Sequence, residues 1–528
     1  MYQLEFRISK MLHPDVYDHA VGKIELIETH ISWVVLTGDF VYKIKKPVDF
    51  GFLDFSTLAK RKEFCEQEFQ LNRRLAPDIY LGVVSINGTI DKPVISKGLD
   101  NDKSFEYAVK MKQFSQSSQL DNMLAEGNLT VELIDALALM VADFHKHTVV
   151  SNTHDSYGKK DKIYNPVTEN FELINESLKT NAYESKLTAI KKWSLKEFTK
   201  LESVFQQRKR DGFVRECHGD MHLRNLAWIN DKPVAFDCIE FNPDLRWIDV
   251  ISEIAFLIMD LQDREQQHLA NRFLNKYLEI TGDYRGLKVL PFYLCYRAMV
   301  RAKVDALRIG QLNQDSEIIQ DEFKAFESYF HLAISYTKSP KPALIIMRGL
   351  SASGKSTVSQ QLLEKTGAIR LRSDVERKRM FGREIGDKVA SDIDKGIYTA
   401  DASEQTYAKL LELASKIITS GFSVIIDAAF LQHQQRISFQ NLASHLVIPY
   451  TIIEVTAPIK VLQQRIIARK NDASDADLSV LNNQIERWKP LYENERMDSL
   501  RVNTEEPLNI EILVKTINNK QVINDESI

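Results

Sequence analysis

The sequence predicts an α+β domain followed by an α/β domain with a parallel sheet. In the first part, strand patterns flank one charged amphipathic helix and then give way to long helical patterns, which is the order of a small mixed lobe and a larger helical lobe. In the second part, short apolar strands alternate with helices, and such alternation places helices on both faces of a parallel sheet. Residues 336–342 separate the two patterns with two prolines among polar residues, so we expect a linker there.

Length, composition and charge are those of an ordinary multidomain globular protein. At 528 residues the chain exceeds one hydrophobic core, and we expect domains over residues 1–335 and 343–517, joined by the linker over 336–342 and followed by a polar tail over 518–528. The formal charge of −4 gives no general attraction to nucleic acid or to anionic membranes. The four cysteines are far apart, no secretory signal is evident, and no apolar stretch is long enough to span a membrane. We therefore expect a cytoplasmic protein with no membrane partner.

The first part begins with a hairpin signal. Gly38-Asp39 stands between two β-rich runs and predicts a hairpin over residues 31–46. A helix over residues 55–75 should end before Pro77, because proline cannot continue a helix. The remaining elements expected are strands at 82–90 and 105–114, a helix at 130–147, and helices over 170–335 that are interrupted by a strand at 233–237.

The second part begins with a glycine-rich turn between a buried strand and a helix. Residues 349–356 read GLSASGKS and match the phosphate loop G-x-x-x-x-G-K-[ST], in which backbone N–H groups surround an anion. Lys355 should approach the β- and γ-phosphates of ATP, and the Ser356 hydroxyl should hold Mg²⁺. The expected strands are 343–347, 368–371, 423–426 and 446–455, and the helix after the loop covers 357–365. The expected nucleotide-binding residues are Gly349, Ser351, Ser353, Gly354, Lys355, Ser356 and Thr357.

Asp427 ends a later apolar strand and is placed like the carboxylate that holds Mg²⁺ through water in phosphate-loop proteins. The next residue is Ala428, whereas ATPase motors usually carry a glutamate there that activates water. This difference favours a kinase, in which a bound substrate supplies the nucleophile.

Two further groups should complete the second site. Asp374 should take the proton of an acceptor hydroxyl, and Arg377 lies three residues later on the same helical face. The alternative is that Ser373 simply caps the N-terminus of a helix here. Arg465 and Arg469 are spaced four residues apart and should close over the transferred phosphoryl group, unless they form only a solvated basic face.

Residues 343–515 resemble the small P-loop kinases, which include polynucleotide 5′-kinases, zeta-toxin-like proteins and gluconate-kinase-like enzymes. The resemblance is carried by the loop, Asp374 with Arg377, Asp427 and the two later arginines. It implies transfer of the ATP γ-phosphate to a hydroxyl and leaves the acceptor open. A nucleic-acid end is the less favoured acceptor, because the chain is acidic and has no aromatic and basic track.

The first part carries a second phosphotransfer pattern. The segment 217–225 reads CHGDMHLRN, in which Asp220 should accept the proton of an acceptor hydroxyl. Asn225 and Asp237 should ligate the metal ions on the ATP phosphates. This variant of the protein-kinase pattern resembles the aminoglycoside phosphotransferase family and its choline- and homoserine-kinase-like relatives. The resemblance implies a kinase-like two-lobe fold for residues 1–335.

The small lobe should supply a Lys–Glu pair for the α- and β-phosphates. Lys43 is the first choice and Lys45 the alternative, and on the following helix Glu68 is preferred to Glu66. A solvated charge run is the alternative for each. The glycine-rich loop that kinases place before the hairpin is replaced by residues 28–32 (ETHIS), where the Thr29 and Ser32 hydroxyls are candidates for phosphate contact.

The whole arrangement resembles bacterial proteins that join an aminoglycoside-phosphotransferase-like half to an ATP-binding P-loop half. We expect each half to use ATP with Mg²⁺ on a small-molecule hydroxyl acceptor. The alternative is that one half, more readily the first with its irregular loop, senses nucleotide and regulates the other. Oligomeric state does not follow from the sequence.

Overall fold

The structure is a computed structural model that describes residues 8–51, 53–96, 104–178, 181–312, 318–384, 387, 399–468 and 477–526. The chain divides into two compact units. Unit 1 comprises residues 1–176 and 195–260, and unit 2 comprises residues 177–194 and 261–528. None of the described helices is both long and apolar enough to cross a membrane.

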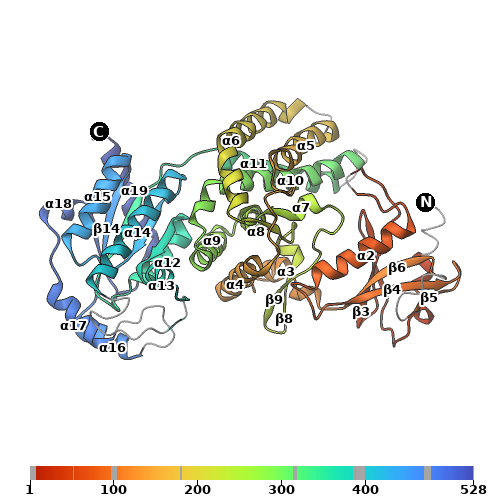
Figure 1. Ribbon diagram of the computed structural model, residues 1–528, viewed down its shortest axis with the longest axis horizontal. Coiled ribbons are helices and arrows are strands. Elements are labelled where there is room, and N and C mark those ends of the chain that lie inside the picture. The colour runs from red at the N-terminus through yellow and green to blue at the C-terminus, as the bar shows by residue number, and fades with distance from the viewer. Residues whose placement is uncertain are drawn as a thin grey trace. The chain divides into compact units, whose positions relative to one another are not determined.

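Unit 1 begins with a six-stranded antiparallel sheet of order β1-β2-β3-β6-β4-β5 (Figure 1). Gly38 adopts a left-handed φ of 102° in the β2–β3 hairpin, as predicted from the Gly-Asp pair. Helix α2 packs against β4 and β6 and begins at an N-cap, Thr57, that accepts a hydrogen bond from Lys60 N–H. The strands are β1 Glu25–Glu28, β2 Ser32–Leu36, β3 Phe40–Lys45, β4 Tyr80–Gly88, β5 Pro93–Ser96 and β6 Glu106–Lys112, and α2 is Leu58–Asn72.

The second half of unit 1 is helical around two small antiparallel sheets. The pairs β7–β10 and β8–β9 flank the segment 217–225, so that this segment is held between short strands on both sides. Its elements are α3 Leu120–Ala125, α4 Val131–His147, α5 Lys160–Leu178, α6 Glu184–Arg210, β7 Val214–Glu216, β8 Leu226–Ile229, β9 Lys232–Ala235, α7 Pro243–Arg246, β10 Trp247–Asp249 and α8 Val250–Asp263, of which α5, α6 and α8 extend into unit 2.

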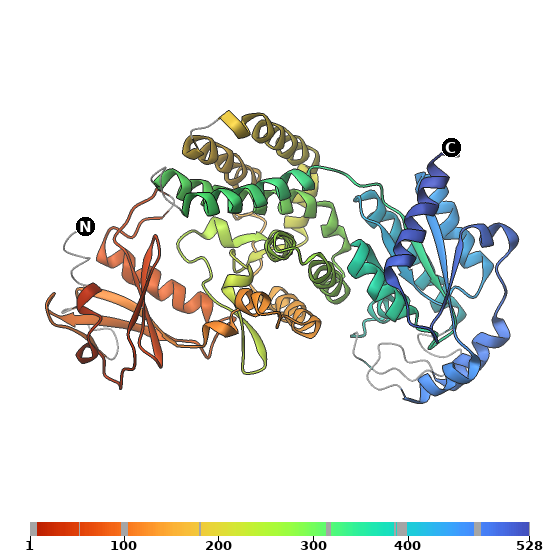
Figure 2. The same cartoon turned by 180° about the vertical axis from the view of Figure 1, so that it is seen from behind.

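Unit 2 joins a helical part to a parallel sheet. The helical part contains α9 Gln267–Thr281, the 3₁₀ helix η5 Tyr284–Lys288, α10 Leu290–Gln311 and α11 Ile318–Tyr336. The five-stranded parallel sheet has the order β12-β13-β11-β14-β15 and lies between helices on both faces (Figure 2). Its strands are β11 Leu344–Arg348, β12 Ile369–Arg372, β13 Val424–Asp427, β14 Tyr450–Thr456 and β15 Ser499–Asn503. The helices are α12 Lys355–Thr366, α13 Ser373–Met380, α14 Ala400–Thr419, α15 His433–Leu446, α16 Ile459–Ala468, α17 Leu478–Arg487, α18 Glu493–Met497 and α19 Ile510–Glu526.

The predicted fold classes are confirmed: an α+β part with a small antiparallel lobe and a helical lobe precedes an α/β part with a parallel sheet. All residues of β11 are buried, because both faces of this central strand are covered. Its sequence therefore shows no alternation of apolar and polar residues. The sequence gives little signal for β15, because its five residues SLRVN alternate at the sheet edge and carry only two apolar side chains.

Candidate active sites

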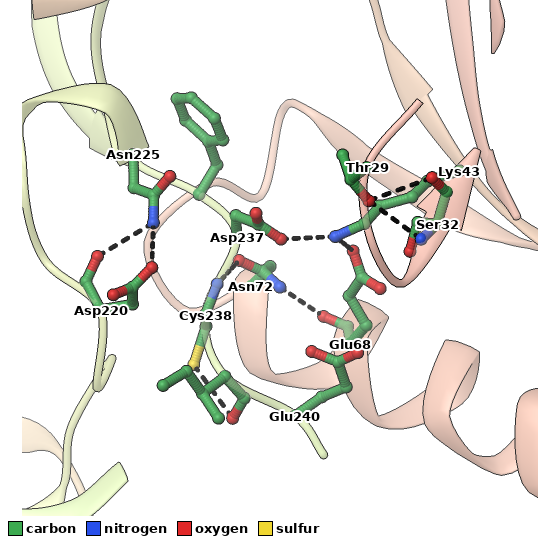
Figure 3. A network of polar contacts seen from close by, with 12 residues as sticks. Thr29, Ser32, Lys43, Glu68, Asn72, Asp220, Asn225, Asp237, Cys238 and Glu240 are labelled. Atoms are coloured by element: carbon green, nitrogen blue, oxygen red, sulfur yellow. Dashed lines mark hydrogen bonds and ion pairs between the residues drawn. The ribbon is translucent and has the colours of Figure 1, made fainter. Parts of the chain in front are cut away.

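The site of unit 1 is built around two lysines on β3. Lys43 and Lys45 point to the same face of the strand and both reach Glu68 of α2, at 2.9 Å to Oε1 and 2.7 Å to Oε2 respectively (Figure 3 shows the Lys43 contact). Lys43 also pairs with Asp237, and Lys45 with Glu240. The Lys45 side chain is 0% exposed and that of Lys43 is 12% exposed, so only Lys43 borders solvent.

Charges in this cluster set the ionisation of its members. Burial raises the pKa of Glu68, but Lys43 and Lys45 outweigh burial and lower it to about 2. Glu240 behaves differently, because burial is the larger effect there and raises its pKa. Both lysines have raised pKa values, because the carboxylates outweigh burial: Asp237, Glu68 and Glu240 do so for Lys43, and Glu240 and Glu68 for Lys45. Glu66, the second choice for the lysine partner, instead forms a surface pair with Lys62 at 3.8 Å.

The loop 217–225 is held by carboxylates from helix α8. Glu253 accepts the backbone N–H groups of His218 (2.7 Å) and Gly219 (2.8 Å), and Asp260 accepts that of Leu223 (2.8 Å). Gly219 has φ +90°, and a Cβ atom there would lie 2.8 Å from the Leu245 carbonyl oxygen, so that glycine is required at this position.

His218 fixes the loop from inside. Its Nδ1 accepts Asp220 N–H at 3.3 Å, so the ring proton is on Nε2, which donates to the Phe236 carbonyl at 2.9 Å. Burial lowers the pKa of His218 to about 4, and the ring is therefore neutral near pH 7. The bond to Nδ1 holds the backbone of Asp220 in place.

Asp220, Asn225 and Asp237 lie together in this site (Figure 3). Asn225 Nδ2 donates to Asp220 Oδ2 at 2.8 Å and to its carbonyl at 3.0 Å, which leaves the amide oxygen out of these bonds. His222 Nε2 lies 3.3 Å from Asp220 Oδ2. Asp237 adopts an unusual φ of 64°, and its N–H donates to the Tyr80 hydroxyl at 3.1 Å.

These groups fit a divalent cation and a nucleotide. The Asp237 side chain is 46% exposed, and its carboxylate together with the amide oxygen of Asn225 supplies the oxygen ligands that Mg²⁺ prefers.

Thr29 closes the turn between β1 and β2: its Oγ donates to Ser32 O (3.0 Å) and accepts Ser32 N–H (2.9 Å). Its hydroxyl is therefore engaged within the turn, and the turn itself contains no glycine.

The site of unit 2 is the loop between β11 and α12. A Cβ atom on Gly349 would lie 2.4 Å from the Val455 carbonyl oxygen, so the loop passes this point only with glycine. Ser353 is 1% exposed, and its Oγ has no hydrogen-bond partner among the described residues. Lys355 Nζ donates to the Leu350 carbonyl at 2.9 Å across the loop. A buried hydroxyl and a lysine around an open loop fit a phosphate group.

Asp427 lies at the carboxyl end of β13, beside Met347 of β11 and Arg372 of β12. Its Oδ2 accepts a hydrogen bond from Ser359 at 3.1 Å. The exposed Ser356 hydroxyl and the Asp427 carboxylate line the same cavity, and such oxygen donors fit Mg²⁺.

One cavity of about 1360 Å³ connects the loop to the predicted acceptor side. The predicted residues that line it are Ser351, Gly354, Lys355, Ser356, Thr357, Asp374, Arg377, Asp427 and Arg465. Arg377 Nη1 pairs with Asp374 Oδ1 at 3.1 Å on helix α13. Arg465 donates to Thr504 Oγ1 at 2.8 Å and to the Ala352 carbonyl at 3.3 Å, so it also braces the loop. Arg469 lies outside the described residues.

Several residues of both sites escaped prediction from sequence. In unit 1 these are Asn72, Tyr80, Glu240, Glu253 and Asp260, and in unit 2 they are Ser359, Gln484 and Thr504. Glu240, three residues after Asp237, was the most accessible to sequence reasoning, because an acidic residue close to a predicted metal ligand is a visible signal. The others act through hydrogen bonds between segments distant in sequence.

Comparison with known proteins finds similarities for both parts of the chain. Residues 344–491 match the family model described as an AAA domain. The uncharacterized protein Rv2004c of Mycobacterium tuberculosis (strain ATCC 25618 / H37Rv) is 28% identical over 462 residues, which cover 87% of this chain and 88% of that protein. The amicoumacin kinase hAmiN, solved with AMP-PNP, Ca²⁺ and Ami, is 15% identical with a TM-score of 0.39, covering 63% of this chain and 93% of its own. A sugar kinase from Janibacter sp. HTCC2649 is 19% identical with a TM-score of 0.27, covering 34% of this chain and 92% of its own.

The folds, the loop geometry and the family match confirm the predicted fusion of an α+β part with a P-loop part.

Proposed function

We propose that the chain is a bifunctional phosphotransferase in which each part transfers the γ-phosphate of ATP to a hydroxyl of a small molecule. The observation that carries the proposal is the recurrence of one arrangement: each site joins a lysine, metal-ligating oxygens and an aspartate placed for a hydroxyl acceptor. Mg²⁺, when bound, would neutralise charge that develops on the phosphate oxygens. Asn225 with Asp237, and Ser356 with Asp427, are the residues proposed to hold it.

In the first site, Lys43 is proposed to meet the phosphates and Lys45 to be structural. The partial exposure of Lys43 and its contact with Asp237 support this choice, whereas Lys45 is enclosed between Glu68 and Glu240. Asp220 takes the proton of the acceptor hydroxyl as its oxygen bonds to the γ-phosphorus, and the bond from that phosphorus to the β–γ bridging oxygen breaks to release ADP. His218 holds the backbone N–H of Asp220, and Asn225 holds its carboxylate.

In the second site, Lys355 and the loop N–H groups bind the phosphates of ATP, and Arg465 steadies the loop. Asp374 is the proposed base for the acceptor hydroxyl, and Arg377 orients its carboxylate while carrying charge towards the transferred group. Arg469 is proposed to act with Arg465. Both acceptors are proposed to be small molecules, since the chain carries no net positive charge for a nucleic-acid end.

A second function, nucleotide sensing by unit 1, is favoured by one observation. The turn that replaces the glycine-rich loop uses the Thr29 hydroxyl internally, so fewer groups are available there to grip the phosphates. In that case the first site binds ATP and transfers nothing.

A metabolite library tests the proposal. The full chain, an Asp220→Ala variant and a Lys355→Ala variant are each incubated with Mg·ATP, and products are screened by mass for the gain of one phosphate. We expect two sets of products, one lost in each variant. Products lost only with Lys355→Ala would leave unit 1 as a sensor, and products unchanged in both variants would contradict the proposal.

A further inference from the structure

The outer edge of the parallel sheet is covered by helix α9. Strand β12 is an edge strand, so one side of its backbone has no strand partner. Asn275 of α9 fills this place: its Oδ1 accepts Arg370 N–H at 2.8 Å, and its Nδ2 donates to the Ala368 carbonyl at 3.1 Å. One buried side-chain amide thus replaces the missing neighbouring strand. In both views α9 lies beside α12 (Figure 1, Figure 2).

The next turn of α9 binds the same strand by charge. Glu279 stands four residues after Asn275, on the same helical face, and its side chain is 7% exposed. Its carboxylate receives Arg370 at 3.3 Å and Arg372 at 3.4 Å. Arg372 directly precedes helix α13, so this contact fixes the point at which the helix starts.

Hydrogen bonds and an ion pair also connect helix α13 to the end of α9 and to η5. The Tyr284 hydroxyl donates to Glu376 Oε1 at 3.1 Å, and Arg379 pairs with Glu376 and donates to the Glu279 carbonyl. Burial, and then Glu376, raise the pKa of Tyr284 well above its ordinary value, so its hydroxyl remains a donor. Gly282 ends α9 with φ +72°, and a Cβ atom there would lie 2.9 Å from Nε of Arg379. The glycine makes room for this arginine.

The face of α13 that contacts α9 and η5 lies opposite the face that lines the cavity. A helix turns about 100° per residue, so Glu376 lies about 200° around the axis from Asp374. Asp374 and Arg377 line the cavity of the P-loop site, while Glu376 and Arg379 are held by α9 and η5. Any shift of the face that contacts α9 and η5 therefore moves the proposed base, Asp374, and Arg377.

We infer that α9 and η5, which precede the predicted linker, are a positioning element for the acceptor side of the P-loop site, with Glu279 and Tyr284 as its positioning residues. The inference rests on the proposed function of that site. It means that the functional P-loop unit begins near residue 267, well before the linker at 336–342. Helix α9 and η5 then belong functionally to the second site.

Two variants and a matched control test this. Each is made in the full chain with Asp220→Ala, which silences the first site, so that the slow basal hydrolysis of Mg·ATP, with water in place of the acceptor hydroxyl, reports on the P-loop site. Tyr284→Phe removes one hydroxyl, and Glu279→Gln removes one charge. Tyr183→Phe is the control, because it removes a similar hydrogen bond to Glu327 (2.7 Å) elsewhere in unit 2. The rate of turnover, the KM for ATP and the affinity for Mg·AMP-PNP are measured, together with hydrogen exchange of residues 373–380.

We expect Tyr284→Phe and Glu279→Gln to lower kcat by about threefold to tenfold, the scale of one or two hydrogen bonds, with KM and AMP-PNP affinity unchanged. Exchange of 373–380 should rise while that of α12 stays constant, and Tyr183→Phe should change neither. Unchanged exchange at 373–380 in both variants would overturn the inference, and so would a loss of AMP-PNP binding together with kcat. Turnover that Lys355→Ala does not affect would contradict the proposed function instead, and hydrogen exchange would still decide the positioning.

Discussion

The two proposed sites are built in different ways. The unit 1 site depends on buried charge: Lys43, Lys45, Glu68 and Glu240 are enclosed together, and their ionisation depends on one another. The unit 2 site depends on backbone shape, because a glycine passes a carbonyl oxygen so closely that no side chain fits. A charge cluster needs partners from distant segments, whereas a shaped loop is written in consecutive residues.

The largest expected effect is the loss of turnover at the first site when its proposed base is removed. Asp220→Ala removes the proposed proton acceptor and should lower turnover at the first site by about 10²- to 10⁴-fold. Turnover is measured in a Lys355→Ala background, in which the second site is silent. Asp143→Ala, at an exposed carboxylate of the same unit, is the control and should have no effect. A fall of less than tenfold would show that Asp220 does not act as the base.

Removal of the buried lysine tests the charge cluster itself. Lys45→Met leaves Glu68 and Glu240 facing each other without their common partner, and should lower the free energy of unfolding of unit 1 by about 3–5 kcal/mol. Lys60→Met is the matched control, because solvent screens its pair with Asp54, and its effect on the free energy of unfolding should be much smaller. Chemical denaturation followed in unit 1 measures both, and equal effects would contradict the cluster.

His218 should make the stability of unit 1 depend on pH. The folded-state pKa of His218, about 4, lies below the ordinary value, so the folded protein binds fewer protons than the unfolded chain. Stability from this group is present above about pH 6.5 and is lost as pH falls towards 4, with about 2 kcal/mol lost between pH 7 and pH 5. Urea denaturation at several pH values should show a shallower pH dependence for His218→Asn. The same slope in His218→Asn and in the exposed control His154→Asn would contradict this.

The smallest effect concerns the shaped loop. Gly349→Ala should weaken Mg·AMP-PNP binding at the second site by about tenfold, or ~1.4 kcal/mol, because the loop must shift away from Val455. Gly421→Ala is the control: it also has positive φ, at +93°, and a Cβ atom there would meet nothing within 4 Å. Calorimetry of each variant in a Lys43→Ala background checks this. An equal loss in Gly421→Ala would show that the close approach is unimportant.

The same difference explains how far the sequence could predict the structure. The loop at 349–356, its flanking strand and helix, and Asp427 follow from local patterns, and the fold of both parts was predicted. The choice between Lys43 and Lys45 stayed open, because both point to one face of β3. The partners that distinguish them, Asp237 for Lys43 and Glu240 for Lys45, come from a distant segment of the sequence. The contacts of Glu253 with the loop and of Asn275 with β12 join segments 34 and 95 residues apart, for which no local pattern exists.

The central claim, two ATP sites of different construction in one chain, is tested most directly by the stoichiometry of Mg·AMP-PNP binding. Calorimetric titration of the full chain should give two sites per chain. Lys355→Ala should remove one and Lys43→Ala the other, and the double variant should bind none. A stoichiometry of one in the unmodified chain, abolished by Lys355→Ala alone, would contradict the account.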